Sequence, residues 1–150
     1  MNSVAFLARF EAKPGKEAEV AKFLEIALDM AKKEPTYDEA QITEKLKELP
    51  GWYLEDGWIR RVYKTDGWPT TLMLVNTIGY LSEAAYQHPD LSVTWGRITV
   101  KLSTHSAGGI TDKDFALARK IEDVVLWRPK EGEALEGTPN KWVRSGDPRG

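Results

Sequence analysis

The chain contains no cysteine. This absence excludes disulfides, zinc sites built on thiolates and cysteine nucleophiles, and it suits a reducing compartment, so we expect a cytoplasmic location. No run of apolar residues is long enough to cross a bilayer. Residues 1–15 lack the basic start and the long apolar stretch of a signal peptide.

Lysine and arginine do not gather into a run, and the formal net charge is −2. The chain therefore lacks the basic footprint of a nucleic-acid-binding protein, and we expect neither a nucleic acid nor a membrane as partner. Its 150 residues are 41% hydrophobic and 29% charged. These values are typical of one globular domain with short appendages.

Proline and glycine divide the N-terminal part of the chain into segments. Residues 4–10 are rich in β-formers and predict a strand, and residues 16–33 have the apolar spacing of a helix that Pro35 ends. Thr36 and Glu39 have the spacing of a capping box and predict the start of a second helix. The apolar stripe of that helix comprises Ile42, Leu46 and Leu49.

The next segments predict a hairpin and a long helix. Asp56-Gly57 lies between two runs of aromatic and β-branched residues, so we expect strands at residues 52–54 and 58–64. Pro69 lies in the first turn of a third helix, predicted over residues 68–86 and ended by His88-Pro89.

Residues 93–104 give the clearest strand signal, because Ile98, Val100 and Leu102 alternate with polar side chains. Thr111 is the predicted N-cap of a last helix that Pro129 ends. The buried stripe predicted for this helix comprises Phe115, Ala118, Ile121 and Val125. We expect the tail to be extended, with three possible anchors, Leu135, Trp142 and Val143.

This order of elements predicts an α+β fold in which helices pack on one face of an antiparallel β-sheet. We divide the chain into an N-terminal strand–helix extension (1–37), a central domain (38–128) and an extended C-terminal tail (129–150).

The chain has two histidines, His88 and His105, and each lies at the end of a predicted element. Histidine titrates near neutral pH, so these two residues are the natural acid–base candidates. On composition and spacing alone, the favoured interpretation is the simpler one, in which the helix-terminal histidine binds backbone carbonyls and the loop histidine is solvated.

A wider pattern surrounds these histidines. Glu83 is followed after three residues by Gln87-His88-Pro89, then by Trp95, by the sequence LSTH ending at His105, and by Asp114 in GGITDKD. Over residues 38–127 this pattern resembles the pterin-4a-carbinolamine dehydratases, whose signature is an acidic residue, His-His-Pro, an aromatic residue, a strand ending in Thr-His, and an aspartate that opens a helix.

The resemblance implies dehydration of 4a-hydroxytetrahydrobiopterin to the quinonoid dihydropterin, with a pterin as substrate and neither metal nor redox cofactor. Two or three histidines exchange the protons in that family, which assigns catalysis here to His105 and His88. It further implies that Trp95 supports the pocket, that Asp114 orients a histidine or the loop, and that the protein forms a dimer or tetramer. Glu83 we interpret as a structural partner of Gln87.

Gln87 departs from the family pattern, because it stands where the first histidine of the pair is expected. Glutamine can still bind a pterin through hydrogen bonds, but glutamine cannot exchange a proton near pH 7. The neighbouring Pro89 could also contact the pterin. The departure leaves a second hypothesis open: a non-catalytic assembly factor on the same fold, such as a RuBisCO assembly chaperone or a dimerisation partner of a regulator.

The N-terminal segment, from Leu7 to Leu24, resembles the first strand and helix of the antibiotic-biosynthesis monooxygenase-like proteins. That domain needs roughly twice the length that precedes Pro50. We therefore interpret the segment as an added strand and helix that supports packing or oligomerisation, with a monooxygenase-like oxidation as the weaker alternative.

Overall fold

The computed structural model describes residues 13–32, 34–139 and 142–146. The chain divides into two compact units, residues 1–34 and 35–150. The first unit contains helix α1 (Glu17–Lys32), which confirms the helix predicted over residues 16–33. The strand predicted at residues 4–10 lies outside the described residues, and the division into extension, central domain and tail stays a prediction.

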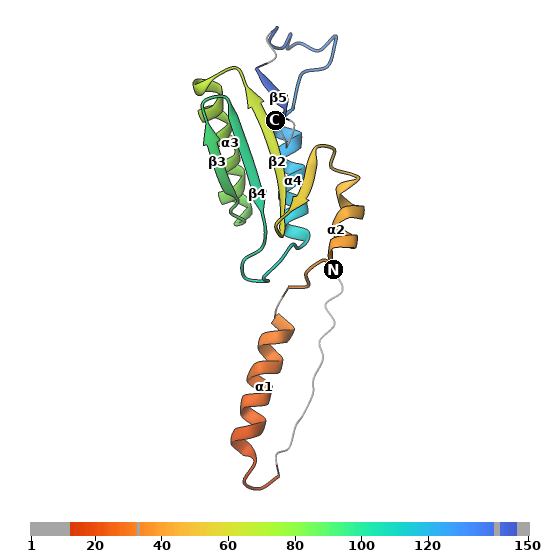
Figure 1. Cartoon of the computed structure of the whole chain (residues 1–150), viewed down its shortest axis with the longest axis vertical. Coiled ribbons are helices and arrows are strands. Elements are labelled where there is room, and N and C mark those ends of the chain that lie inside the picture. The colour runs from red at the N-terminus through yellow and green to blue at the C-terminus, as the bar shows by residue number, and fades with distance from the viewer. Residues whose placement is uncertain (1–12, 33, 140–141, 147–150) are drawn as a thin grey trace. The chain divides into compact units, whose positions relative to one another are not determined.

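An antiparallel sheet forms the centre of the second unit (Figure 1). Its main path runs β1 (Trp52–Glu55), β2 (Trp58–Thr65), β4 (Arg97–Leu102) and β3 (Asp90–Thr94). Strand β5 (Val143–Ser145) pairs with the end of β2, and Val143 is buried there, whereas Leu135 is exposed. Of the three possible tail anchors, Val143 therefore enters the core and Trp142 packs against it, partly buried.

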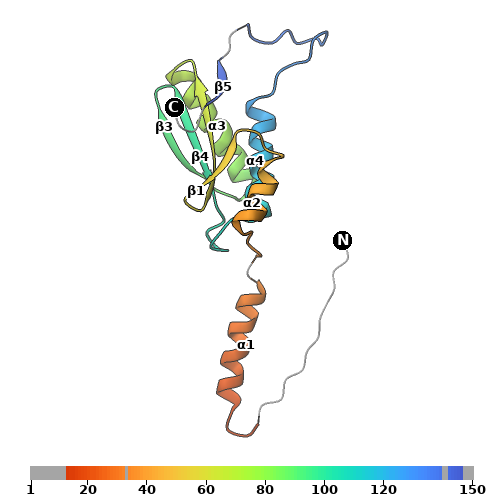
Figure 2. The same cartoon turned by 45° about the vertical axis from the view of Figure 1, so that its right-hand side comes forward.

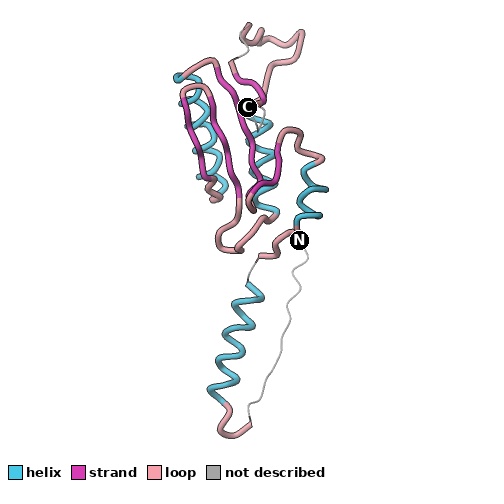
Figure 3. The backbone as a smooth tube through the Cα atoms, in the orientation of Figure 1, coloured by secondary structure: helices cyan, strands magenta, loops and turns pink. Residues whose placement is uncertain are grey.

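Helices cover one face of this sheet, as predicted (Figures 2 and 3). Helices α3 (Trp68–Ala85) and α4 (Asp112–Val125) pack on that face, and α2 (Glu39–Leu46) precedes β1. The core between the layers comprises fully buried side chains, among them Ile59, Ile78, Ile98, Val100, Leu102, Ala118 and Ile121. The fold is therefore the α+β arrangement expected from the sequence.

Two of the turns between elements differ in how well the sequence predicted them. The β1–β2 hairpin turns at Asp56 and Gly57, with φ angles of 50° and 76°, and it confirms the Asp-Gly signal. The single strand predicted at residues 93–104 is wrong, because the chain reverses at Trp95-Gly96 and forms β3 and β4. β-formers flank this turn and no Asn-Gly or Asp-Gly pair marks it, so the periodicity concealed it.

The start of α2 is also a correction. The capping box uses Asp38 and Gln41 in place of Thr36 and Glu39: Gln41 N–H donates to Asp38 Oδ1 (2.8 Å), and Asp38 N–H donates to Gln41 Oε1 (3.0 Å). Tyr37 N–H donates to the carbonyl of Ile110 (2.9 Å), which ties the residue before this cap to the loop that leads into α4. The cap at Thr111 and the stripe of α4 are confirmed.

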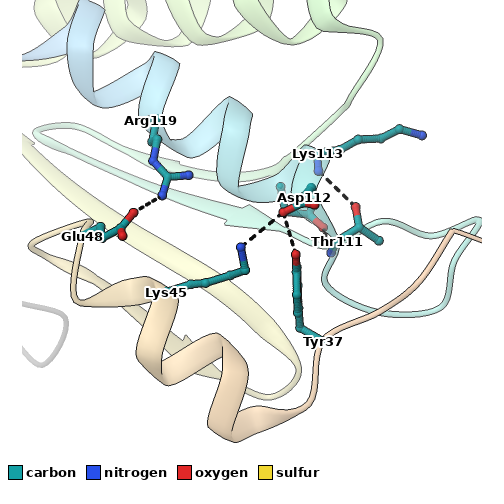
Figure 4. Close-up of polar contacts among 8 residues, drawn as sticks. Tyr37, Lys45, Glu48, Thr111, Asp112, Lys113 and Arg119 are labelled. Carbon is teal, nitrogen blue, oxygen red and sulfur yellow. Dashed lines mark hydrogen bonds and ion pairs between the residues drawn. The ribbon is translucent and has the colours of Figure 1, made fainter. Parts of the chain in front are cut away.

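Polar side chains connect α2 and the residues on either side of it to α4 (Figure 4). The Tyr37 hydroxyl donates to Asp112 Oδ1 (2.7 Å), Lys45 Nζ lies 3.4 Å from the same oxygen, and Arg119 donates to Glu48 (2.5 Å). The Tyr37 hydroxyl, with a smaller contribution from Lys45, holds the pKa of the Asp112 carboxyl below its ordinary value of 3.8. These contacts are exposed, so each contributes modestly to stability.

Replacing Tyr37 by phenylalanine removes this hydroxyl but keeps the ring that packs edge-on against Phe115, with centroids 5.8 Å apart. A carboxyl whose pKa is lowered in the folded state adds stability above its unfolded pKa and loses it as pH falls through the folded pKa. The free energy of unfolding of the wild type should therefore exceed that of Tyr37→Phe by less than about 1 kcal/mol at pH 6. This difference in stability should vanish well below pH 4. Urea unfolding at several pH values measures it, and a difference that grows toward low pH would contradict the assignment.

A buried ionic cluster joins β2 to α4. Arg61, 2% exposed, donates through Nε to Glu122, and the same carboxylate accepts from Tyr63 Oη (2.7 Å) and Trp52 Nε1 (3.0 Å). Burial, above all, raises the pKa of Tyr63, so its hydroxyl remains protonated and donating. Gly51 leaves room for the guanidinium, because a Cβ there would collide with Arg61 Nη1.

Candidate functional site

The C-terminal end of α3 and the loop after β4 enclose a pocket of about 240 Å³. Its lining comprises Tyr86, Gln87, His88, Ser103, Thr104, His105 and Ser106. Tyr86 caps α3 in the left-handed conformation, with φ 52°, so the chain leaves the helix there and carries Gln87 and His88 to the pocket. The two histidines, distant in sequence, therefore meet at one site.

His88 is exposed and is held by the last turn of α3. Its Nε2 lies 2.9 Å from Glu83 Oε2, and its ring meets the ring of Tyr86 edge-on, with centroids 5.8 Å apart. A carboxylate can only accept, so a neutral His88 donates Nε2–H to Glu83 and keeps its lone pair on Nδ1. Glu83 is thus the partner of His88, which corrects the expectation that it would contact Gln87.

His105 is exposed on the loop that follows β4. A bridge between Thr104 and Gly109 closes this loop, and the carbonyl of Thr104 accepts from the N–H groups of Ala107 and Gly108. The His105 ring meets Trp58 edge-on, with centroids 5.4 Å apart. The imidazole is therefore placed by an ordered loop and an aromatic neighbour while it remains open to solvent.

Below the histidines, Gln87 belongs to a buried polar network. Its Nε2 donates to Asp114 Oδ1 (2.8 Å) and to Thr104 Oγ1 (3.1 Å). Asp114, fully buried at the start of α4, also accepts from Thr104 Oγ1 and from the Thr111 N–H, both at 2.8 Å. The network ties the end of α3, the loop after β4 and the first turn of α4 into one floor for the pocket.

This network fixes the orientation of the Gln87 amide. Both amide hydrogens are engaged, and a flipped side chain would place its carbonyl oxygen against the Asp114 carboxylate. The carbonyl oxygen is consequently the atom that Gln87 can offer to a ligand in the pocket. Position 87 thus presents a hydrogen-bond acceptor that is unable to carry a proton.

Comparison with known proteins shows which family this domain belongs to. The family described as pterin 4 alpha carbinolamine dehydratase matches residues 35–124, which include every residue of the pocket. The chain belongs to this family.

Relatives in this dehydratase family match the same part of the chain. Proteins from Roseiflexus castenholzii, Chloroflexus aurantiacus and Aquifex aeolicus, to which the name pterin-4-alpha-carbinolamine dehydratase is provisionally assigned, are 39%, 40% and 41% identical. The matches cover 59%, 61% and 58% of this chain and 95%, 98% and 88% of theirs. A crystal structure described as a transcriptional coactivator/pterin dehydratase from Brucella melitensis superimposes with a TM-score of 0.56 at 29% identity, covering 59% of this chain and 96% of that one.

Three other residues of the predicted dehydratase site lie outside the pocket lining. Trp95, 68% exposed, lies in the β3–β4 turn against Gly67, the N-cap of α3, whereas the pocket lies at the other end of that helix. Pro89 leads from His88 into β3, and Asp114 lies beneath the pocket. The structure therefore groups His88, His105 and Gln87, supports them with Asp114, and leaves Trp95 apart.

The sequence did not reveal two neighbours of this pocket, one aromatic and one polar. Trp58 starts β2, and the antiparallel register places it next to the end of β4, where His105 follows. Thr104 precedes His105 and is buried, with a hydroxyl shared by Gln87, Thr111 and Asp114. Only the strand register could have identified Trp58, whereas the Thr-His pair was visible in the sequence without indicating this role.

The described part of the chain offers neither a metal-binding cluster nor a membrane-spanning helix. There, no three or more His, Asp or Glu side chains gather in a geometry that could hold a metal ion. Nor does any helix within the described ranges have the length and apolar character needed to traverse a bilayer.

Proposed function

We propose that the chain dehydrates a 4a-hydroxytetrahydropterin to the quinonoid dihydropterin through His88 and His105. One observation carries this proposal: two exposed imidazoles and one oriented amide line a single pocket within the segment that matches the dehydratase family. The relatives' names supply the substrate class, a pterin 4a-carbinolamine.

The reaction requires two proton transfers. A base removes the proton on N5, the electron pair forms the C4a=N5 double bond, and the C4a–O bond breaks while an acid protonates the departing hydroxyl to give water. Glu83 holds His88 with its lone pair on Nδ1, which suits the base. His105, for which no carboxylate contact is found among the described residues, suits the acid.

Gln87 has a binding role in this proposal. Its carbonyl oxygen can accept a hydrogen bond from a ring or amino N–H of the pterin, because Asp114 and Thr104 hold the amide in place. The amide cannot replace a third proton-carrying imidazole, so turnover should be slower than a histidine at this position would give.

The alternative of a non-catalytic assembly factor receives no support from this geometry. A site built only for protein docking would not require two open imidazoles with a carboxylate on one of them. Self-association remains part of the proposal, since α3 exposes Leu72, Met73 and Tyr80, which suit contact with a second copy.

Proton NMR can test whether both histidines contact a pterin. The chain has only two histidines, so the imidazole C–H signals can be assigned with His88→Ala and His105→Ala. Titration with 7,8-dihydrobiopterin should shift both imidazoles with one common Kd, while the indole N–H of Trp95 stays unchanged. A shift of one imidazole alone, or of neither, would refute the shared pocket.

Replacing Gln87 by histidine should raise kcat by about 10²-fold, the lower end of what one acid–base group contributes. One ring nitrogen can keep the hydrogen bond to Asp114 while the other faces the pocket. The variant should lose about 1 kcal/mol of stability, because the bond to Thr104 is not replaced. Steady-state turnover of the 4a-carbinolamine measures the gain.

Gln87→Met is the matched control, since it has a similar length but no amide. It should weaken pterin binding without raising kcat, and it should cost about 1–3 kcal/mol because the buried Asp114 loses a donor. Equal turnover in wild type and Gln87→His would show that the missing imidazole does not limit the rate.

A further inference from the structure

A second groove shares Gln87 with the pocket that holds the histidines. It has a volume of about 200 Å³ and lies between the end of α3 and one face of α4. Its lining comprises Ala85, Gln87, Lys113, Ala116, Leu117 and Lys120. Gln87 borders both this groove and the reaction pocket, so one ligand could occupy the two together.

The groove combines an apolar floor with a cationic rim. Ala85, Ala116 and Leu117 provide the floor, and the two lysines lie at its edges. Lys113 and Lys120 are two turns apart on the same face of α4, which separates their Cα atoms by about 10 Å. Figure 4 shows the Lys113 side chain extending away from Tyr37 and Lys45. A flat apolar group with a negative charge at its far end would match these surroundings.

The chemistry of the proposed reaction brings such a group to the groove. The atoms that react are N5 and C4a, and these must lie beside His88 and His105. Carbon C6 is bonded directly to N5, so a substituent on C6 leaves the ring next to the reacting edge. Gln87 lines both the pocket that would hold this edge and the second groove.

We infer that the substrates of this chain are pterins with a long substituent on C6, apolar near the ring and anionic at its end. The p-aminobenzoylglutamate group of reduced folates has this chemistry. The inference rests on the proposed function, and it adds that Lys113 and Lys120 determine the preference for the charged substituent.

Binding measurements on the intact chain test the inference without turnover. The probes are folic acid, its dimethyl ester, which has nearly the same shape without the charges, and 6-hydroxymethylpterin. Isothermal titration should give a Kd for folic acid about tenfold lower than for the ester in wild type. In Lys113→Gln/Lys120→Gln, the ratio of the Kd of the ester to the Kd of folic acid should fall to about one. The Kd of 6-hydroxymethylpterin should stay unchanged.

A matched control removes two positive charges elsewhere on the surface. Lys47 and Lys130 are exposed and lie outside both grooves, so Lys47→Gln/Lys130→Gln should keep the wild-type ratio. Raising the salt concentration should reduce the preference in wild type but not in the Lys113/Lys120 variant.

The outcomes separate the two proposals. Equal affinity for folic acid and its ester in wild type, or a ratio that persists in Lys113→Gln/Lys120→Gln, overturns the role of the groove and leaves the dehydratase proposal standing. Failure of all three probes to bind overturns both.

Discussion

Replacing His105 by alanine is expected to reduce the rate of 4a-carbinolamine dehydration by about 10²–10⁴-fold. In our account this imidazole protonates the departing hydroxyl, and position 87 provides no other proton-carrying group. His105 is exposed and its ring contact is with Trp58, so the substitution should leave the fold intact. Steady-state assays, with circular dichroism as a check of folding, measure the loss.

Trp95→Ala is the control for this prediction. Trp95 is aromatic and exposed like Trp58, but it lies by the N-terminal end of α3, away from the pocket. Its removal should leave the rate within about twofold of wild type. A His105→Ala protein that retains wild-type turnover would remove His105 from the mechanism, and a large loss in Trp95→Ala would restore Trp95 to the site.

Replacing Glu122 by alanine should lower the free energy of unfolding by about 3–5 kcal/mol. The Glu122 carboxylate accepts from Arg61, Tyr63 and Trp52, and the Arg61 guanidinium stays buried when that carboxylate is removed. Such a loss is a large part of the stability of a small domain. Urea denaturation followed by tryptophan fluorescence measures it.

The double variant Arg61→Met/Glu122→Leu distinguishes loss of the carboxylate from loss of packing. Because it removes the buried charge together with its partner, it should be more stable than Glu122→Ala alone. If the double variant were the less stable protein, the ion pair itself would be the source of the stability.

The sequence was sufficient for much of the fold. Alternation at Ile98, Val100 and Leu102 identified a strand with one buried face, and the Asp56-Gly57 pair located a hairpin that the structure confirms. It failed at Trp95-Gly96, where β-formers continue through a turn, and at Thr36, where a tertiary hydrogen bond from Tyr37 to Ile110 favours a later helix start.

The sequence predicted those residues of the candidate site that lie at the ends of helices or strands. His88 and His105 were identified because each terminates an element, and the structure brings both to one pocket. The positions of His88 and His105 in the sequence could not show which side chains lie next to them in space. Glu83 reaches His88 because Tyr86 adopts the left-handed conformation, and Trp58 reaches His105 through the register of β2 and β4. Trp95, which the family resemblance assigned to the pocket, lies in the β3–β4 turn, and the single strand predicted over residues 93–104 did not show that turn.

The central claim is that this pocket, with its two imidazoles and one amide, dehydrates a pterin carbinolamine. The most direct measurement is the decay of 4a-hydroxytetrahydropterin, generated in situ and followed by absorbance, with increasing amounts of the wild-type protein. Our account predicts a rate that rises in proportion to protein concentration above the spontaneous reaction. A decay that stays at the spontaneous rate at every concentration would contradict it.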